Sequence, residues 1–166
     1  MKTAAVVVDW RRPRETIDAL NSLAAMSPAP DLLICVENGG RPEESALVRL
    51  EAPQQTQIVE LDENLGFAGG CNAGMQVALE AGADWTLVLN NDATVAPNCL
   101  SACLDAAAAD PRIAVVGPAV AFADRPDRLW YAGGVVSHWF GFTRHRGLGR
   151  AATKPPPSGQ VSYVSG

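Results

Sequence analysis

The sequence has no long apolar run. None of its hydrophobic stretches approaches the ~20 residues that a membrane-spanning helix needs. The stretch at residues 4–8 is too short for a signal peptide, and charged residues follow it at once. The four cysteines include no Cys-x-x-Cys pair, so neither a zinc site nor a disulfide framework is indicated. We therefore expect a cytoplasmic protein, with the inner face of the membrane as the alternative location.

Basic residues are fewer than acidic ones, 13 against 18, which gives a net charge of −5. Residues 125–166 contain six basic and one acidic side chain, so +5, which leaves −10 for residues 1–124. We expect no binding to nucleic acid from an acidic protein, although the basic segment can still face phosphate or a membrane surface. For Arg144, Arg146 and Arg150, a solvated loop is the simpler interpretation.

The two best-known nucleotide-binding loops are also missing. The densest glycine run, residues 62–74, lies between a predicted strand and a predicted helix, where glycines let the backbone approach a ligand. Gly69 and Gly74 have the P-loop spacing, but Met75 and Gln76 stand where that loop needs a lysine and a hydroxyl. No glycine triplet here has the Gly-x-Gly-x-x-Gly spacing, so a Rossmann dehydrogenase is not indicated.

Apolar runs of strand length alternate with segments of helix length. This alternation is typical of an α/β protein with a mostly parallel, doubly wound sheet. The sequence predicts strands over residues 3–8, 32–36, 57–61, 85–89 and 113–120, and helices from Pro13 to before Pro28 and over residues 43–50, 67–81 and 97–109.

After Pro126 the pattern changes to short aromatic segments separated by glycines. They predict a small β-hairpin extension, residues 125–166, of the α/β core formed by residues 1–124. The three prolines at 155–157 exclude a helix over residues 151–159, which we expect to be a mobile loop. The sequence predicts short strands over residues 129–132, 135–138, 142–144 and 161–164.

The apolar run at residues 85–89 stops abruptly at Asn90, Asn91 and Asp92. Such a run suits a parallel strand buried on both faces, and its end then lies at the carboxyl edge, where open α/β sheets bind ligands. Asp92 suits a hard divalent cation that completes its shell with water and phosphate oxygens. Taken alone, Asn-Asn-Asp is better explained as a turn followed by a helix cap, because these residues favour both.

Four segments together resemble the successive motifs of family 2 glycosyltransferases, particularly the bacterial rhamnosyltransferase-like branch. They are Val-Asp-Trp-Arg-Arg-Pro at residues 8–13, Val-Glu-Asn-Gly at 36–39, Glu-Asn-Leu-Gly-Phe-Ala-Gly-Gly-Cys-Asn-Ala-Gly at 63–74 and Leu-Asn-Asn-Asp at 89–92. The third and fourth are the specific ones. The resemblance implies a GT-A fold, which is a Rossmann-like α/β sheet.

The resemblance also implies a site for a nucleoside-diphosphate sugar. Asp9 stands where the family has a small hydroxyl residue, Glu37 where it has an aspartate, and Arg11 where it has an asparagine. Asn90 replaces the first acid of an Asp-x-Asp motif, so Asp92 is the one metal ligand expected for Mg²⁺ or Mn²⁺. The implied donor-binding set is Asp9, Arg12, Glu37, Asn38, Asn64, Gly66, Asn72, Asn90, Asn91 and Asp92.

The implied chemistry is transfer of a sugar, from dTDP-rhamnose or a UDP-sugar, to a hydroxyl of a glycan or lipid-linked acceptor, with inversion. Bacterial surface polysaccharide synthesis is the implied context. Residues 164–166 resemble the start of the family's next motif, so the general base is expected beyond Gly166. A chain cut there would bind donor, self-associate through apolar surface and leave membrane attachment to the absent portion. His138 and His145 match no family motif.

Two alternatives stay open. A sugar-phosphate nucleotidyltransferase shares the strand order, but residues 9–13 lack the glycine-rich basic loop that those enzymes have after the first strand. A non-catalytic module that binds nucleotide or docks a partner would keep the fold without needing Asp92. We also expect Gly74 to serve close helix packing rather than ligand binding.

Overall fold

The computed structural model describes residues 1–165 and divides into two compact units at Ser101/Ala102. This division comes earlier in the chain than the change of character predicted at residue 124. No helix among residues 1–165 has the length and apolar character needed to cross a membrane. The two units are described separately below.

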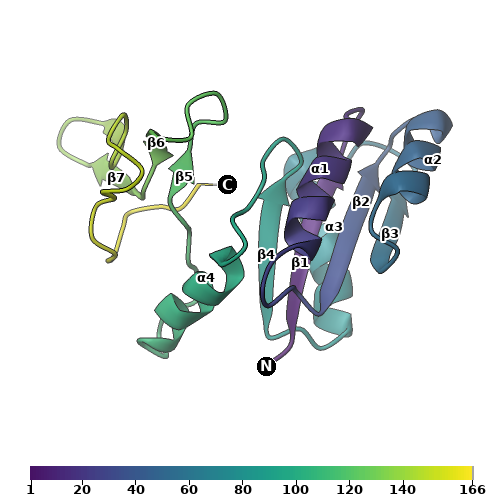
Figure 1. The fold of residues 1–166 in the computed structure, drawn as a ribbon, viewed down its shortest axis with the longest axis horizontal. Coiled ribbons are helices and arrows are strands. Elements are labelled where there is room, and N and C mark those ends of the chain that lie inside the picture. The colour runs from purple at the N-terminus through teal and green to yellow at the C-terminus, as the bar shows by residue number, and fades with distance from the viewer. Residues whose placement is uncertain (166) are drawn as a thin grey trace. The chain divides into compact units, whose positions relative to one another are not determined.

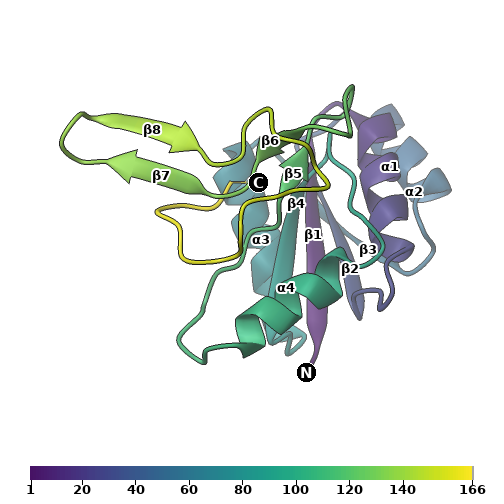
Figure 2. The same ribbon diagram turned by 60° about the vertical axis from the view of Figure 1, so that its left-hand side comes forward.

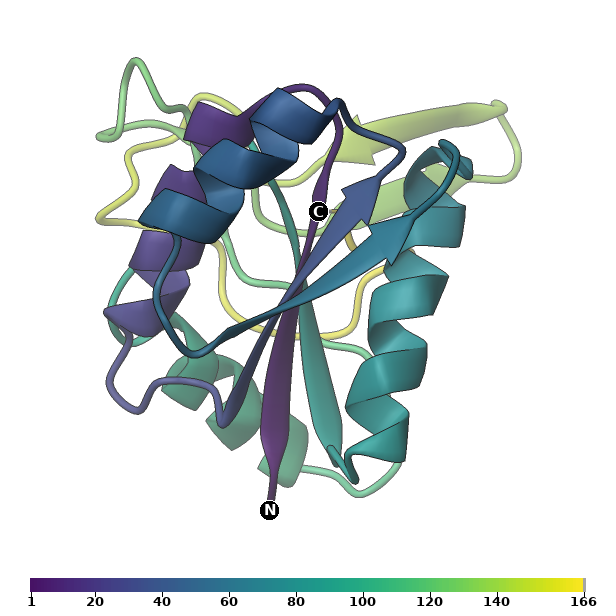
Figure 3. The same ribbon diagram turned by 90° about the vertical axis from the view of Figure 1, so that its right-hand side faces the viewer.

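The first unit is a parallel sheet with helices on both faces. Figure 3 shows α1 and α2 on one face and α3 on the other, and Figure 1 labels the elements. The strands run in the order β3-β2-β1-β4, all parallel, which confirms the predicted α/β class. The elements are β1 (Thr3–Asp9), α1 (Pro13–Ala24), β2 (Leu32–Asn38), α2 (Pro42–Glu51), β3 (Thr56–Leu61), α3 (Gly66–Glu80) and β4 (Trp85–Asn90).

The core lies where α3 crosses β1 and β2. Strand β1 is buried along its whole length, as its continuous apolar run predicts. A Cβ atom at Gly74 would lie 2.4 Å from Cγ1 of Val6, and one at Gly70 would lie 2.6 Å from Cγ1 of Val8. The packing role expected for Gly74 is therefore confirmed, and Gly70 shares it.

Strand β4 differs from the expectation of burial on both faces. It is an edge strand of the four-stranded sheet, and each of its six residues is partly exposed. The apolar composition of β4 could not show whether the strand lies at the edge or in the centre of the sheet. Helices can cover the faces of an edge strand as well as those of a central one, so both kinds of strand can be apolar.

The second unit contains two short antiparallel pairs, and helix α4 (Cys99–Ala108) crosses the boundary into it. Strand β5 (Val120–Ala121) pairs with β6 (Leu129–Tyr131), and β7 (Gly134–Ser137) pairs with β8 (Phe142–His145). The β7–β8 hairpin, visible in Figure 2, confirms the predicted hairpin.

Two strand predictions for this unit are wrong. Residues 113–119 lie outside any strand. Pro118 has no N–H to donate to a β-ladder, and strand pairing begins only after it, at β5. Residues 161–164 form a single bridge, Tyr163 to Gly134, rather than a strand. The carbonyl of Tyr163 accepts the hydrogen bond of this bridge from Gly134 N at 3.1 Å, and it accepts a second one from Tyr131 Oη at 2.6 Å. The segment 151–159 contains no helix, as predicted.

Arg11, between β1 and α1, has a backbone φ of +60°. This left-handed conformation costs most L-residues about 1–2 kcal/mol, while asparagine adopts it more readily. We expect Arg11→Asn to raise the free energy of unfolding by about 0.5–1 kcal/mol, after the loss of the Arg11–Trp10 cation–π contact is subtracted. Urea denaturation followed by circular dichroism measures this change.

The matched control is Arg14→Asn, which makes the same replacement inside α1. There the backbone is helical and asparagine is the poorer helix former, so stability should stay equal or fall. If both variants gained the same stability, the replacement of arginine by asparagine, and not the φ angle at Arg11, would determine the effect.

Candidate functional site

The carboxyl ends of the parallel strands bring the predicted residues to one edge of the sheet. Asp9 ends β1, Asn38 ends β2 and Asn90 ends β4. Asp9 and Glu37 are partners in the β1–β2 register, so their side chains leave the same face of neighbouring strands. This edge is where ligands of open α/β sheets bind.

Asp9 is buried, and the hydroxyl of Thr16 links it to Asn91, which follows β4. The Thr16 hydroxyl donates to Asp9 Oδ1 at 2.5 Å and accepts from Asn91 Nδ2 at 3.2 Å. Burial raises the pKa of Asp9, although the bond from Thr16 opposes the rise. Thr16 was not predicted as a site residue. The available signal was a polar residue within the apolar stripe of α1.

Glu37 is the second buried acid at this edge. Arg49 Nη2 lies 3.5 Å from Glu37 Oε2 and also contacts Glu60. Burial raises the pKa of Glu37, and a hydrogen bond from the Ser45 side chain and the charge of Arg49 oppose that rise. Among residues 1–165, Glu37 Oε1 is buried without a hydrogen-bond partner, which costs free energy unless a bound group donates to it. Arg49 was also missed by sequence reasoning.

Asn38 holds the glycine-rich loop against the end of β2. Its Nδ2 donates to Asn64 Oδ1 and to the Gly66 carbonyl, both at 3.0 Å, and its Oδ1 accepts from Leu65 N at 2.9 Å. The Gly66 amide also donates to Asn64 Oδ1, at 2.8 Å. Asn38 and Asn64 therefore fix the shape of the loop through the same atoms that could otherwise contact a ligand.

The loop after β2 lies against the loop after β3. Gly39 has φ +69°, and a Cβ atom there would lie 2.5 Å from Asn64 N. Only glycine fits this position, because the conformation and the close approach both exclude a side chain. Gly39 lies in a motif quoted from the sequence, but the contact it permits could not be predicted.

Asp92 lies just beyond β4 and its side chain is 57% exposed. Its Oδ2 lies 3.9 Å from Arg12 Nη1, which makes a loose ion pair that a ligand can replace. Among residues 1–165, no three His, Cys, Asp or Glu side chains gather into a metal-binding group. One accessible carboxylate fits a cation that takes its other ligands from water and phosphate.

The remaining predicted residues are not linked to these networks. Asn72 is exposed on α3 and Asn90 is partly exposed. Within residues 1–165, neither forms a side-chain hydrogen bond with the other predicted residues. Trp10 and Phe67 are exposed next to the motifs that contain them, so apolar surface adjoins the polar edge.

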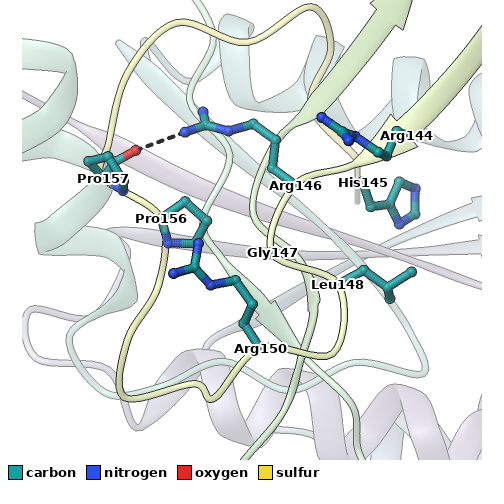
Figure 4. Close-up of a pocket in the computed structure, with 8 residues that line it drawn as sticks. All are labelled: Arg144, His145, Arg146, Gly147, Leu148, Arg150, Pro156 and Pro157. Carbon is teal, nitrogen blue, oxygen red and sulfur yellow. Dashed lines mark hydrogen bonds between the residues drawn. The ribbon is translucent and has the colours of Figure 1, made fainter.

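The second unit contains a separate hollow of about 480 Å³. Figure 4 shows the arginines and prolines around it. Arg146 Nη2 donates to the Pro157 carbonyl at 3.2 Å, so this arginine also ties the proline segment to the end of β8. The lining residues are Arg144, His145, Arg146, Gly147, Leu148, Arg150, Pro156 and Pro157.

Two characterised relatives are similar to most of this chain. The galactofuranosyltransferase GlfT1 of Mycobacterium tuberculosis is 39% identical over 127 residues, which is 75% of this chain and 41% of that protein. GlfT1 of Mycolicibacterium smegmatis is 34% identical over 125 residues, with the same coverage of 75% and 41%. This chain thus spans about two-fifths of the length of these relatives.

The fold is also found among solved structures. The crystal structure of TarS from S. aureus aligns with a TM-score of 0.50 and 21% identity, covering 65% of this chain and 19% of that one. The model of the family described as glycosyl transferase family 2 matches residues 7–159. That range contains all four motifs and the whole strand edge, and the chain belongs to glycosyl transferase family 2.

Proposed function

We propose that the protein transfers a sugar from a nucleoside diphosphate to a hydroxyl of a glycan or lipid-linked acceptor, with inversion, in cell-wall polysaccharide synthesis. The observation that carries the proposal is the position of Asp92, accessible at the carboxyl edge beside Arg12. Family membership and the relatives named as galactofuranosyltransferases support it.

The donor is proposed to lie across the strand edge. Glu37 would accept from a base N–H or a ribose hydroxyl, which would give its buried Oε1 the partner it lacks. Asp9, Asn38, Asn64, Gly66 and Asn72 would surround the donor from the strand ends and the glycine-rich loop. Asn90 and Asn91 would flank its diphosphate.

Arg12 and Asp92 are proposed to act on the diphosphate. Arg12 would leave its loose ion pair to bind a phosphate oxygen, and Asp92 would hold Mg²⁺ or Mn²⁺. When bound, such a cation neutralises the charge that develops on the departing diphosphate. The acceptor oxygen bonds to the anomeric carbon while the bond to the diphosphate breaks, and the acceptor proton passes to a base. We assign no base among residues 1–165.

The sugar is proposed to be galactofuranose, since both curated relatives are named for it. A rhamnosyl donor is the second candidate, and it rests on the motif resemblance alone. A transfer assay with UDP-galactofuranose and dTDP-rhamnose, each at equal concentration with a lipid-linked glycan acceptor, decides between them. Transfer from neither donor would contradict both sugar assignments.

We expect Asp92→Asn to weaken metal-dependent nucleotide binding by about 10- to 100-fold, because contacts to a charged group contribute about 1.5–3 kcal/mol. Calorimetric titration with UDP and with dTDP, each in Mn²⁺ and in EDTA, measures the change. In Mn²⁺ the wild-type protein should bind one of the two nucleotides more tightly than the other. In EDTA it should lose most of its affinity for that nucleotide.

The matched control is Asp84→Asn, at the opposite end of β4, where the carboxylate accepts from the Lys2 amide at 2.7 Å. This variant should bind nucleotide as the wild type does. If Asp92→Asn also binds normally, Asp92 is not the metal ligand. Binding that is equally strong in EDTA would favour a non-catalytic nucleotide-binding module.

The burial of Asp9 should make the free energy of unfolding depend on pH. The pKa of Asp9 is raised in the folded protein, so between the unfolded and the folded pKa the folded state binds more protons than the unfolded state does. The stability contributed by Asp9 therefore falls as pH rises from the unfolded pKa through the raised folded pKa. Asp9→Asn keeps the oxygen that accepts from Thr16 and removes this loss.

We thus expect Asp9→Asn to be more stable than the wild type at pH 7, with the difference shrinking as pH falls towards 4. Urea unfolding midpoints at a series of pH values test this. Asp18→Asn removes an exposed carboxylate of α1 and serves as the control for the change of charge. A destabilised Asp9→Asn at pH 7 would mean that the charge of Asp9 is needed for folding.

A further inference from the structure

The turn of the β7–β8 hairpin and the first residue of β8 expose three aromatic side chains. Trp139 is 95% exposed, Phe140 80% and Phe142 52%. The rings of Phe140 and Phe142 stack with their centroids 6.2 Å apart. Figure 2 shows the two strands of the hairpin and the turn that joins them. Large apolar side chains gathered on one exposed turn usually mark an interaction site.

The hairpin belongs to a segment with basic charge only. Residues 129–165 contain three arginines and one lysine but no aspartate or glutamate. Elsewhere most arginines have a carboxylate partner, as Arg112 has in Asp110 and Arg49 has in Glu37. Among residues 1–165, Arg144 and Arg146 form no salt bridge, so their charge is available to an anionic surface.

The aromatic and basic groups are ordered along the hairpin. Phe142 pairs with Ser137 next to the turn, and Arg144 pairs with Val135 two residues further back. Phe142 and Arg144 lie on the same face of β8. They are two residues apart, which is about 7 Å along the strand at the ~3.3 Å rise per strand residue. Arg146 and Arg150 follow along the chain and line the hollow of the second unit (Figure 4).

We propose that this turn inserts into the surface of a bilayer rich in anionic lipid. Aromatic rings settle at the boundary between headgroups and acyl chains, and arginines bind lipid phosphates just outside it. The apolar layer of a bilayer would meet the aromatic turn, and the anionic headgroup layer above it would meet the arginines behind the turn. The two layers follow each other over ~5–10 Å, which is similar to the spacing along the hairpin. A second copy that presented the same hairpin would instead oppose cation to cation.

Sedimentation with vesicles tests the proposal without any need for transfer activity. The protein is mixed with vesicles of pure phosphatidylcholine or of phosphatidylcholine with phosphatidylglycerol, and the bound fraction is measured. We expect binding to the anionic vesicles only. Trp139→Ser with Phe140→Ser should reduce it by about tenfold or more, and Arg144→Gln by about fivefold. Trp139→Phe, which keeps an aromatic ring, should retain most of it.

The matched control is Leu79→Ser on α3, where the replaced side chain is 67% exposed. It should bind as the wild type does, and unfolding midpoints should show that all variants fold. The proposal is wrong if the wild type binds neither vesicle or if the hairpin variants bind unchanged. It is also wrong if the wild type dimerises without lipid and the hairpin variants do not, because the turn would then join two copies.

Discussion

The close approach of α3 to the parallel sheet is the constraint on which the first unit depends. Without Cβ atoms at Gly70 and Gly74, the helix backbone can lie against Val6 and Val8. This contact fixes the start of α3 near the ends of β1 and β2, where Asn38 can bind the loop that precedes the helix. A bulkier helix would move that loop away from the strand edge, so packing in the core determines the geometry of the site.

The same edge contains two buried carboxylates. Asp9 and Glu37 are buried and their pKa values are raised, which means that burial disfavours the charged form of each. A buried acid whose charged form is disfavoured is a cost that function can explain. Each acid is held in a defined orientation, by Thr16 and by Arg49 respectively.

Sequence reasoning located the parallel strands and the residues at their ends because both depend on local patterns. An apolar run that stops at polar residues fixes both a strand and its end, as in residues 85–92. The partners Thr16 and Arg49 were not predicted, since each meets its acid only after a helix packs on the sheet. Residues 113–119 have the apolar composition of a strand but form none, and Pro118 among them has no N–H for a ladder hydrogen bond.

The charges at the strand edge give a reason for a cation in the proposed function. A diphosphate placed there would lie near the carboxylates of Asp9, Glu37 and Asp92, all of the same sign. Arg49 is already paired with Glu37 and Glu60, so Arg12 is the basic side chain nearest to Asp92 that could compensate. One guanidinium, itself half exposed, is weakly effective against several negative charges because water screens it. A divalent ion held by Asp92 would reverse the local sign and let the donor bind, and the neutral Asn90 would limit the repulsion that remains.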